Sequence, residues 1–300
     1  MDLEGHIVEL TQLRYFQTAA YYQHISRAAE ELNISQPALS TMISRLEKEL
    51  GVPLFDHNGR SIILNQNGQR FLQRVNHILM EVENSKRELQ DIADEGDNSI
   101  SLAVSSSQFL QGMHAFMYQH PNYKWNQRVA ENKEIAALLN RGQIDLAVTS
   151  PGIYGEVFES TLLLRDIFKL AVHKDNPLAQ RKSVRLEELT DQRFIMLLKG
   201  LPFRTQTDRI FADLGITPHY IMECDHLLRR ELINANAGVT IASQSASFRH
   251  LFSENIRFLD IEDVHHTRDI VMVHRKGRYL NRASRQFADY LVLVALQSYQ

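Results

Sequence analysis

The segment SRAAEELNISQPALSTMISRLEKELG, residues 26–51, decides how the N-terminal part of this chain folds. Apolar residues recur at helical spacing on both sides of a polar interruption at Asn33. Asparagine tolerates the left-handed backbone conformation that a tight turn between helices often needs. The segment therefore predicts two short amphipathic helices joined by a turn.

Hydroxyl-bearing residues mark the beginning of both helices. We expect Ser26 to cap the first helix and Ser35 to cap the second, because a serine hydroxyl can accept a backbone N–H that has no partner inside the helix. The second helix is expected from about Gln36 to Leu50, and Pro37 suits its first turn, where the missing N–H costs nothing.

The second helix has one apolar face and one polar face. Its leucine and isoleucine residues face inward at 100° per residue, and the opposite face is short and polar, as is typical of a helix that enters the major groove of DNA. Gln36 could pair with an adenine edge, and Arg45 with guanine or a phosphate. The alternative is the solvated surface of a small helical bundle. The residues expected to contact DNA here are Ser26, Arg27, Ser35, Gln36, Pro37, Ser40, Thr41, Ser44, Arg45 and Lys48.

Two flanking segments complete this unit. Leu13 and Phe16 belong to the buried stripe of a preceding helix. Residues 52–65 predict a β-hairpin with a two-residue turn at Asn58-Gly59. Arg60 at its tip could reach a minor groove or a phosphate, although a solvated turn residue is an equally good interpretation.

Residues 10–65 resemble the winged helix-turn-helix of LysR-type transcriptional regulators. The resemblance is carried by LRYF (13–16), RAAEELNISQPALS (27–40), RLEKELGVPLF (45–55) and GR (59–60). It implies a head that binds double-stranded DNA. Thr41, Met42 and Ser44 stand where the family often carries Arg, Gln or Lys.

A long helix is predicted from Gly68 to about Asp94, because the segment has no proline and no later glycine. Its apolar residues alternate in steps of four and three, which is the repeat of a coiled coil, broken only at Ser85. A second copy of the helix is the simplest partner, and packing on the chain's own C-terminal part is the alternative. The residues expected in the dimer seam are Phe71, Val75, Ile78, Val82, Leu89 and Ile92.

Strand-like and helix-like segments alternate beyond residue 98, which predicts an α/β fold with a mostly parallel sheet. This half resembles the two-lobed, periplasmic-binding-protein-like effector domain of the same family, through NRGQIDLAVTS (140–150), LAVHKDNPLA (170–179) and LGITPHYIMECD (214–225). NANAGVTIASQSA (234–246) departs from the glycine-richer family pattern.

The expected organisation therefore has three parts. A winged helix-turn-helix domain spans 1–65, a linker and dimerisation helix spans 66–95, and an effector-binding domain spans 96–300. The first lobe of that domain is expected over 98–160 and 268–300, and the second over 161–267.

Three strand ends or loops are candidates for effector binding, because ligands in open α/β sheets lie beyond the carboxyl ends of strands and at helix N-termini. Hydroxyls and one arginine there suit a small anion, with Arg204 bidentate to a carboxylate. Ordinary helix capping is the alternative for each serine. The residues concerned are Ser105, Ser106, Ser107, Thr149, Ser150, Leu201, Phe203 and Arg204.

Composition limits the class of protein. The 300 residues are 44% hydrophobic and contain one cysteine, which excludes an internal disulfide framework and fits a cytoplasmic compartment; no secretion signal or membrane span is expected. Residues 1–95 carry a net charge of −5 and residues 96–300 one of +2. The acidic head argues against nucleic-acid binding unless its basic residues are well placed. Phosphate contacts are expected from Arg27, Arg45, Lys48, Arg60 and Arg70.

Weaker signals point to no further chemistry. Cys224 is expected to be a buried, inert thiol. His265 and His266, with Asp263 and Asp269, match no common metal-ligand spacing and are expected in a surface loop. No catalytic or phosphate-binding motif is present, so no cofactor and no enzyme activity is expected.

The sequence therefore predicts a ligand-responsive regulator that binds an inverted-repeat operator as a homodimer, and by the resemblance as a homotetramer. The rival interpretation is a cytoplasmic small-molecule-binding module whose N-terminal helices contact other proteins.

Overall fold

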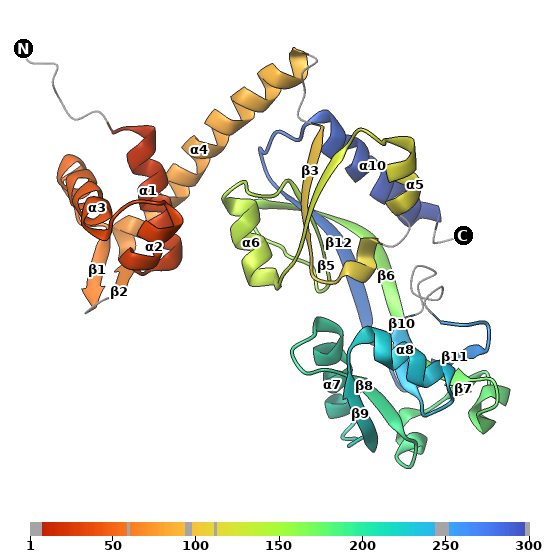
Figure 1. The fold of residues 1–300 in the computed structure, drawn as a ribbon. Helices are drawn as coiled ribbons and strands as arrows, with labels where there is room; N and C mark the ends of the chain where they lie inside the picture. The colour runs from red at the N-terminus through yellow and green to blue at the C-terminus, as the bar shows by residue number, and fades with distance from the viewer. Residues whose placement is uncertain (1–7, 59–60, 94–97, 111–112, 244–251, 298–300) are drawn as a thin grey trace, which may run out of the picture. The chain divides into compact units, whose positions relative to one another are not determined.

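The computed structural model describes residues 8–58, 61–93, 98–110, 113–243 and 252–297 (Figure 1). The chain divides into two compact units. The first extends to Asp97 and includes Asn140–Gly142, and the second holds Asn98–Leu139 and Gln143–Gln300.

The first unit is a small helical head with a hairpin and one long helix. Phe16 is fully buried at its centre, with ring centroids 5.5 Å from Phe55 and 5.1 Å from Phe71. Apolar residues from every helix and both strands surround it, so the head has a core of its own. The elements are α1 (Leu10–Tyr22), α2 (Ile25–Glu31), α3 (Gln36–Leu50), β1 (Phe55–Asn58), β2 (Ser61–Leu64) and α4 (Gln66–Ile92).

The turn between α2 and α3 forms as the sequence predicts. Asn33 has a φ of 54°, in the left-handed region. The Ser35 hydroxyl caps α3 by accepting the backbone N–H of Ala38 at 3.3 Å. The prediction for Ser26 is wrong: α2 begins at Ile25 with His24 as its N-cap, and no side chain caps it. Ser26 lies inside the helix, because the extended backbone that a cap requires falls two residues earlier.

The hairpin is present, but its turn is displaced from the predicted position. Asn58 is the last residue of β1 and pairs with Ser61, so it is a strand residue and not the first residue of the turn. Residues 59–60, and with them Arg60, lie outside the described residues.

Helix α4 is divided between two environments. Val75 is fully buried and Phe71 is half-buried in the core of the head, so these two side chains hold α4 against its own chain. The prediction that Val75 faces a dimer seam is therefore wrong. Further along, Ile78 is 43% exposed, Leu89 67% and Ile92 75%, while Val82 is half-buried.

The second unit is built on a mixed sheet rather than the mostly parallel one predicted. β3 pairs in parallel with β4 and β5, but the strands around β6 are antiparallel. The strand order is β4-β3-β5-β12-β6-β11-β7, with β10 also on β6 and a separate parallel pair β8-β9. Its strands are β3 (Ser99–Val104), β4 (Lys124–Val129), β5 (Leu146–Thr149), β6 (Phe158–His173), β7 (Ser183–Val184), β8 (Phe194–Leu197), β9 (Tyr220–Cys224), β10 (Thr240–Ser243), β11 (Ile256–Ile261) and β12 (Thr267–Arg275).

Five α-helices and three short 3-10 helices accompany these strands in the described part of this unit. They are α5 (Met113–Gln119), α6 (Asn132–Asn140), α7 (Pro202–Asp213), α8 (His226–Asn234) and α10 (Arg282–Gln297), with η1 (Ser107–Leu110), η2 (Pro177–Gln180) and η3 (Leu186–Leu189). The described residues between β3 and β4 thus form two separate helical pieces, η1 and α5.

Two lobes share the long strand β6 (Figure 1). Phe158–Ile167 of β6 pairs with β12 in the first lobe, and Phe168–His173 pairs with β10 and β11 in the second. The first crossover is therefore inside a strand, at Ile167-Phe168, later than the predicted position near 160. Neighbouring residues of β3 face opposite sides: Leu102 packs with α5 and α10, and Ala103 packs with α6.

Candidate functional site

The polar face of α3 is a candidate DNA-reading surface. Its apolar face is buried through Leu39, Ile43 and Leu46, which leaves the predicted contact residues outward. Two of these residues, Ser26 and Ser40, are half-buried. The other eight are exposed: Arg27, Ser35, Gln36, Pro37, Thr41, Ser44, Arg45 and Lys48. The backbone thus presents the predicted residues on one accessible helix and its N-terminal flank.

Three hydrogen bonds orient side chains on this surface. The Ser26 hydroxyl donates to Gln36 Oε1 at 3.1 Å, which ties α2 to the beginning of α3. With Oε1 accepting from Ser26, the Gln36 amide N–H groups are the ones turned to a partner. Thr41 Oγ1 donates to the Pro37 carbonyl at 2.9 Å. Arg45 Nε donates to Glu49 Oε1 at 2.9 Å; the Arg45 side chain is 64% exposed and that of Glu49 is 9% exposed.

The acidic residues of the head have structural partners elsewhere. Glu47 Oε1 accepts the backbone N–H groups of Leu54 and Phe55 at 2.7 and 3.2 Å, where the hairpin begins. Glu83 pairs with Arg14 at 3.1 Å, and Glu31 accepts the Tyr22 hydroxyl. These carboxylates serve the fold of the head, so its net negative charge is not gathered on the outward face of α3.

A small pocket of about 120 Å³ in the second unit is a candidate effector site. It lies where β3, β5 and β12 of the first lobe meet the loop before α7 and the N-terminus of α8. Six of the eight predicted effector residues line it. The lining consists of Ser105, Ser106, Ser107, Phe109, Val129, Ser150, Leu201, Pro202, Phe203, His226 and Arg268.

The ends of β3 and β5 supply the hydroxyl groups of this pocket. Ser105 Oγ accepts the backbone N–H of Ser150 at 3.0 Å, which fixes the two strand ends side by side. The Ser150 hydroxyl is buried and has no hydrogen-bond partner among the described residues. Thr149 is fully buried and does not line the pocket. A buried hydroxyl without a partner is costly, so Ser150 is placed to bind a ligand group.

The structure contradicts the role predicted for Arg204. Its guanidinium is buried and pairs with Asp208 at 2.6 Å and Glu223 at 2.7 Å, and it also donates to the Leu197 carbonyl. It lines neither pocket described in this unit. Two carboxylates already neutralise Arg204, because the first turn of α7 directs this side chain toward β8 and β9.

Arg268 is the arginine that lines the pocket, and the sequence analysis missed it. It begins the buried part of β12 and pairs with the buried Asp166 at 3.3 Å. Its guanidinium lies 4.8 Å from the Phe203 ring centroid and 5.6 Å from that of Phe109. Burial lowers its pKa to about 10, against the opposing effect of Asp166. The signal for Arg268 in the sequence was its charged side chain two residues before the apolar run IVMV (270–273).

Two further basic side chains lie beside Arg268. Arg229 is buried in α8 and donates to the Ile241 carbonyl at 3.3 Å, and burial, with a smaller effect of Arg268, lowers its pKa to about 10. His226 lines the pocket, and burial, followed by Arg229 and Arg268, lowers its pKa to about 4. The imidazole is therefore neutral at pH 7. Arg268 pairs with the buried carboxylate of Asp166 and Arg229 donates to a backbone carbonyl, so two buried guanidinium groups lie close together at this place.

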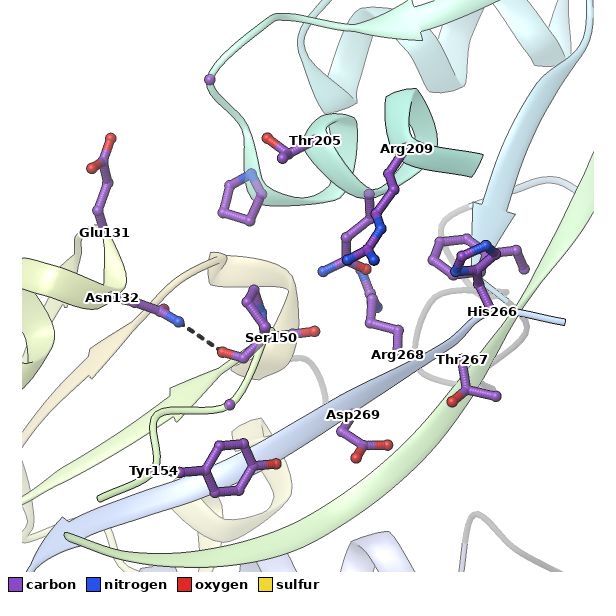
Figure 2. A pocket seen from close by; sticks show the side chains of 16 residues that line it. Glu131, Asn132, Ser150, Tyr154, Thr205, Arg209, His266, Thr267, Arg268 and Asp269 are labelled. Carbon is purple, nitrogen blue, oxygen red and sulfur yellow. Dashed lines mark hydrogen bonds between the residues drawn. The ribbon is translucent and has the colours of Figure 1, made fainter. Parts of the chain in front are cut away.

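A larger pocket of about 660 Å³ adjoins the small one (Figure 2). The two share Ser150, Pro202 and Arg268. In Figure 2, Glu131, Asn132 and Tyr154 lie on one side of the larger pocket and Arg209 and His266 on the other. We call the pocket of about 120 Å³ the inner pocket and this one the outer pocket.

The remaining residues singled out in the sequence have ordinary partners. Cys224 is buried, and burial raises the pKa of its thiol, which makes it a poor nucleophile at neutral pH. Asp263 accepts the backbone N–H groups of Leu186 and Glu187, and His266 pairs with Asp213. Within the described ranges, no group of three or more His, Cys, Asp or Glu residues is placed to hold a metal ion, and no helix is long and apolar enough to cross a membrane.

An exposed polar helix on a winged head, followed by a two-lobed α/β unit with a pocket, defines a DNA-binding regulator with a ligand-binding domain. Residues 10–69 match the family model "Bacterial regulatory helix-turn-helix protein, lysR family", and residues 94–294 match "LysR substrate binding domain". The chain belongs to the LysR family of DNA-binding transcriptional regulators, and it is a regulator rather than an enzyme.

Individual relatives agree with this assignment. The chain is 31% identical over 290 residues to the HTH-type transcriptional regulator YybE of Bacillus subtilis (strain 168), covering 95% of this chain and 98% of that one. The fold is similar to a full-length OxyR variant from Pseudomonas aeruginosa, with a TM-score of 0.64, 20% identity and coverage of 97% and 95%. It is also similar to full-length CbnR in complex with its target DNA, with a TM-score of 0.55, 22% identity and coverage of 96% and 99%.

Proposed function

We propose that this regulator holds a small anion in the inner pocket and that the occupied pocket alters how its heads bind DNA. The observation that carries the proposal is a pair of adjacent buried guanidinium groups beside an unpartnered hydroxyl. Arg268 lines the pocket next to Arg229, and the Ser150 hydroxyl has no hydrogen-bond partner in the described structure. A carboxylate or an oxyanion of similar size would accept from both Arg268 and Ser150.

The beginning of α7 supports the same ligand chemistry. Its N-cap residue, Leu201, provides no side-chain cap, and Pro202 occupies the first turn. The first backbone N–H groups of a helix have no partner within it, and the positive end of the helix dipole favours an anion. Leu201 and Phe203 line the inner pocket, so a bound anion would contact both lobes at once.

A ligand that contacts both lobes can change the equilibrium between their arrangements. A coupling of about 1–3 kcal/mol is sufficient to change promoter occupancy or DNA bending. We further propose that the chain works in the cytoplasm, where its DNA partner is, and binds an inverted-repeat operator as a homodimer or as a tetramer of two such dimers. Two recognition helices related by two-fold symmetry require half-sites about one DNA turn apart.

The test is calorimetry with acetate, sulfate and longer carboxylates on the full chain. We expect Arg268→Gln and Ser150→Ala each to weaken binding, Arg268→Gln by at least about tenfold, whereas Arg204→Gln retains the affinity. Undiminished anion binding by both Arg268→Gln and Ser150→Ala would contradict the proposal. Thermal unfolding of each variant separates lost binding from lost folding.

A further inference from the structure

We infer that the effector has two parts: an anionic head in the inner pocket and a body that carries hydroxyl or amino hydrogen-bond donors in the outer pocket. The inference rests on the proposed anion site and adds the chemical class of the rest of the molecule. It follows from the connection between the two pockets, from their sizes and from the hydrogen-bonding groups of the outer walls.

The two pockets form one continuous site. Ser150, Pro202 and Arg268 line both, so a group bound to Ser150 and Arg268 has the outer pocket directly beside it. Any substituent on the anion that does not fit inside therefore extends into the outer pocket.

The sizes of the pockets require a divided ligand. Water occupies about 30 Å³ per molecule in the liquid, so the inner pocket of about 120 Å³ holds roughly four waters and a ligand group of a few atoms. The outer pocket of about 660 Å³ is within the range of about 300–1,000 Å³ found for small-molecule sites. A carboxylate or phosphate fits the first, and a metabolite body the second.

The outer walls offer hydrogen-bond acceptors that the protein does not use. In the described parts of the chain, neither the Glu131 carboxylate nor the Gln206 amide has a hydrogen-bond partner. Asn132 Nδ2 donates to the Pro151 carbonyl at 2.8 Å, which leaves its Oδ1 to accept. These groups come from the beginning of α6 and from α7, on opposite sides of the pocket.

Two of the basic residues of the outer pocket, Arg209 and His266, share one carboxylate partner. Asp213 pairs with both Arg209, at 3.7 Å, and His266, at 3.2 Å. Asp269 in turn pairs with Arg165 at 3.0 Å. The Glu131 carboxylate and Asn132 Oδ1 are acceptors, and they match a ligand body with hydroxyl or amino donors.

Tyr154 adds a fixed surface to this pocket. A Cβ atom placed on Gly152 would lie 2.6 Å from two ring carbons and from the hydroxyl oxygen of Tyr154, so this side chain packs directly on the glycine backbone. The Tyr154 side chain is 63% exposed and lines the outer pocket. Alanine at position 152 would displace the ring without removing it.

Four carboxylates test the inference by calorimetry on the full-length protein at constant ionic strength. Acetate is the anionic group almost alone, and caproate adds an apolar body. Gluconate and ε-aminocaproate have the same carbon number as caproate, but their bodies carry hydroxyl or amino donors. We expect gluconate or ε-aminocaproate to bind at least about tenfold more tightly than caproate. Caproate binding as tightly as both donor-bearing compounds would overturn the inference.

Substitutions in the outer pocket provide the second arm. Glu131→Gln is expected to reduce the preference for ε-aminocaproate, Gln206→Ala the preference for gluconate, and Gly152→Ala both, with acetate affinity unchanged. The matched controls are Glu254→Gln and Gln180→Ala, which lie outside both pockets.

The two proposals fail in different ways. If acetate binding depends on Arg268 while none of the outer substitutions changes the order of the four ligands, the anion site stands and the two-part ligand is wrong. If no carboxylate competes with sulfate and Arg268→Gln changes nothing, the anion site itself is wrong.

Discussion

His226 shows how burial sets the charge of a single residue. Its pKa is lowered to about 4, first by burial and then by Arg229 and Arg268. Because the folded pKa is below the unfolded value of about 6.5, the unfolded chain binds more protons between these two pH values. Folding stability should therefore fall as the pH drops from about 6.5 toward 4.

We predict that His226→Gln removes this dependence. The difference in the free energy of unfolding between wild type and variant should change by about 2–3 kcal/mol between neutral pH and about pH 4. Urea unfolding across that pH range measures this change. Parallel pH profiles for the two proteins would show that folding does not shift the pKa of His226.

The outward face of α3 gives a second residue-level prediction. Ser44→Ala and Arg45→Ala should weaken specific more than non-specific DNA binding, by about 1–3 kcal/mol if Arg45 reads a base. Electrophoretic shifts with the regulator's own upstream DNA and with random DNA give the ratio of specific to non-specific affinity. Lys182→Ala removes an exposed positive charge from the second unit and should leave that ratio unchanged. An equal loss on both DNAs would restrict Arg45 to phosphate contact.

Residues of the site differ in how visible they were in the sequence. The serines at 105–107 and Ser150 could be predicted, because they follow apolar strands directly and strand ends converge in an α/β sheet. Arg268 could not, because it reaches the pocket from an antiparallel strand far along the chain from Phe203. Arg204 was mistaken because its partners Glu223 and Asp208 are set by the packing of α7 on β8 and β9.

At the scale of elements, α4 combines attachment to the head with an exposed apolar stripe. Val75 and Phe71 pack in the head, and Ile78, Leu89 and Ile92 are exposed in the single chain. A heptad pattern predicts which residues share a face, but it does not distinguish a partner helix from the chain's own core. This is why the predicted seam extended too far toward the head.

We predict that Leu89→Asp weakens dimerisation without unfolding the chain. Burying a leucine side chain contributes about 1.5–3 kcal/mol, so its loss from a symmetric seam should raise the dimer dissociation constant at least about tenfold. Sedimentation equilibrium measures it. Gln90→Asp introduces the same charge at the exposed neighbouring position and serves as the control. Equal effects of both substitutions would place the dimer contact elsewhere.

For the whole molecule, the two units have separate cores, and the head includes residues from every helix of its own segment. We predict that a fragment of residues 1–95 folds, dimerises weakly and binds DNA without responding to any effector. Fluorescence anisotropy with operator DNA, with and without the effector, measures both properties. A response of the fragment to the ligand would show that sensing does not require the two-lobed unit.

The overall architecture was largely predictable and its strand connections were not. Apolar periodicity and turn residues located the helices and the hairpin of the head to within a few positions, and they indicated an α/β fold beyond residue 98. The sequence of β6 does not show where one lobe ends and the next begins, because the strand continues through the crossover with apolar residues on both sides.

Strand β6 contributes to the cores of both lobes: Leu163 packs in the first, and Phe168, Leu170 and Val172 pack in the second. Neither lobe can lose its sheet without removing a strand from the other. Hydrogen exchange should therefore report one cooperative unfolding event for both halves, and a ligand bound in either should slow the exchange of amides in the other.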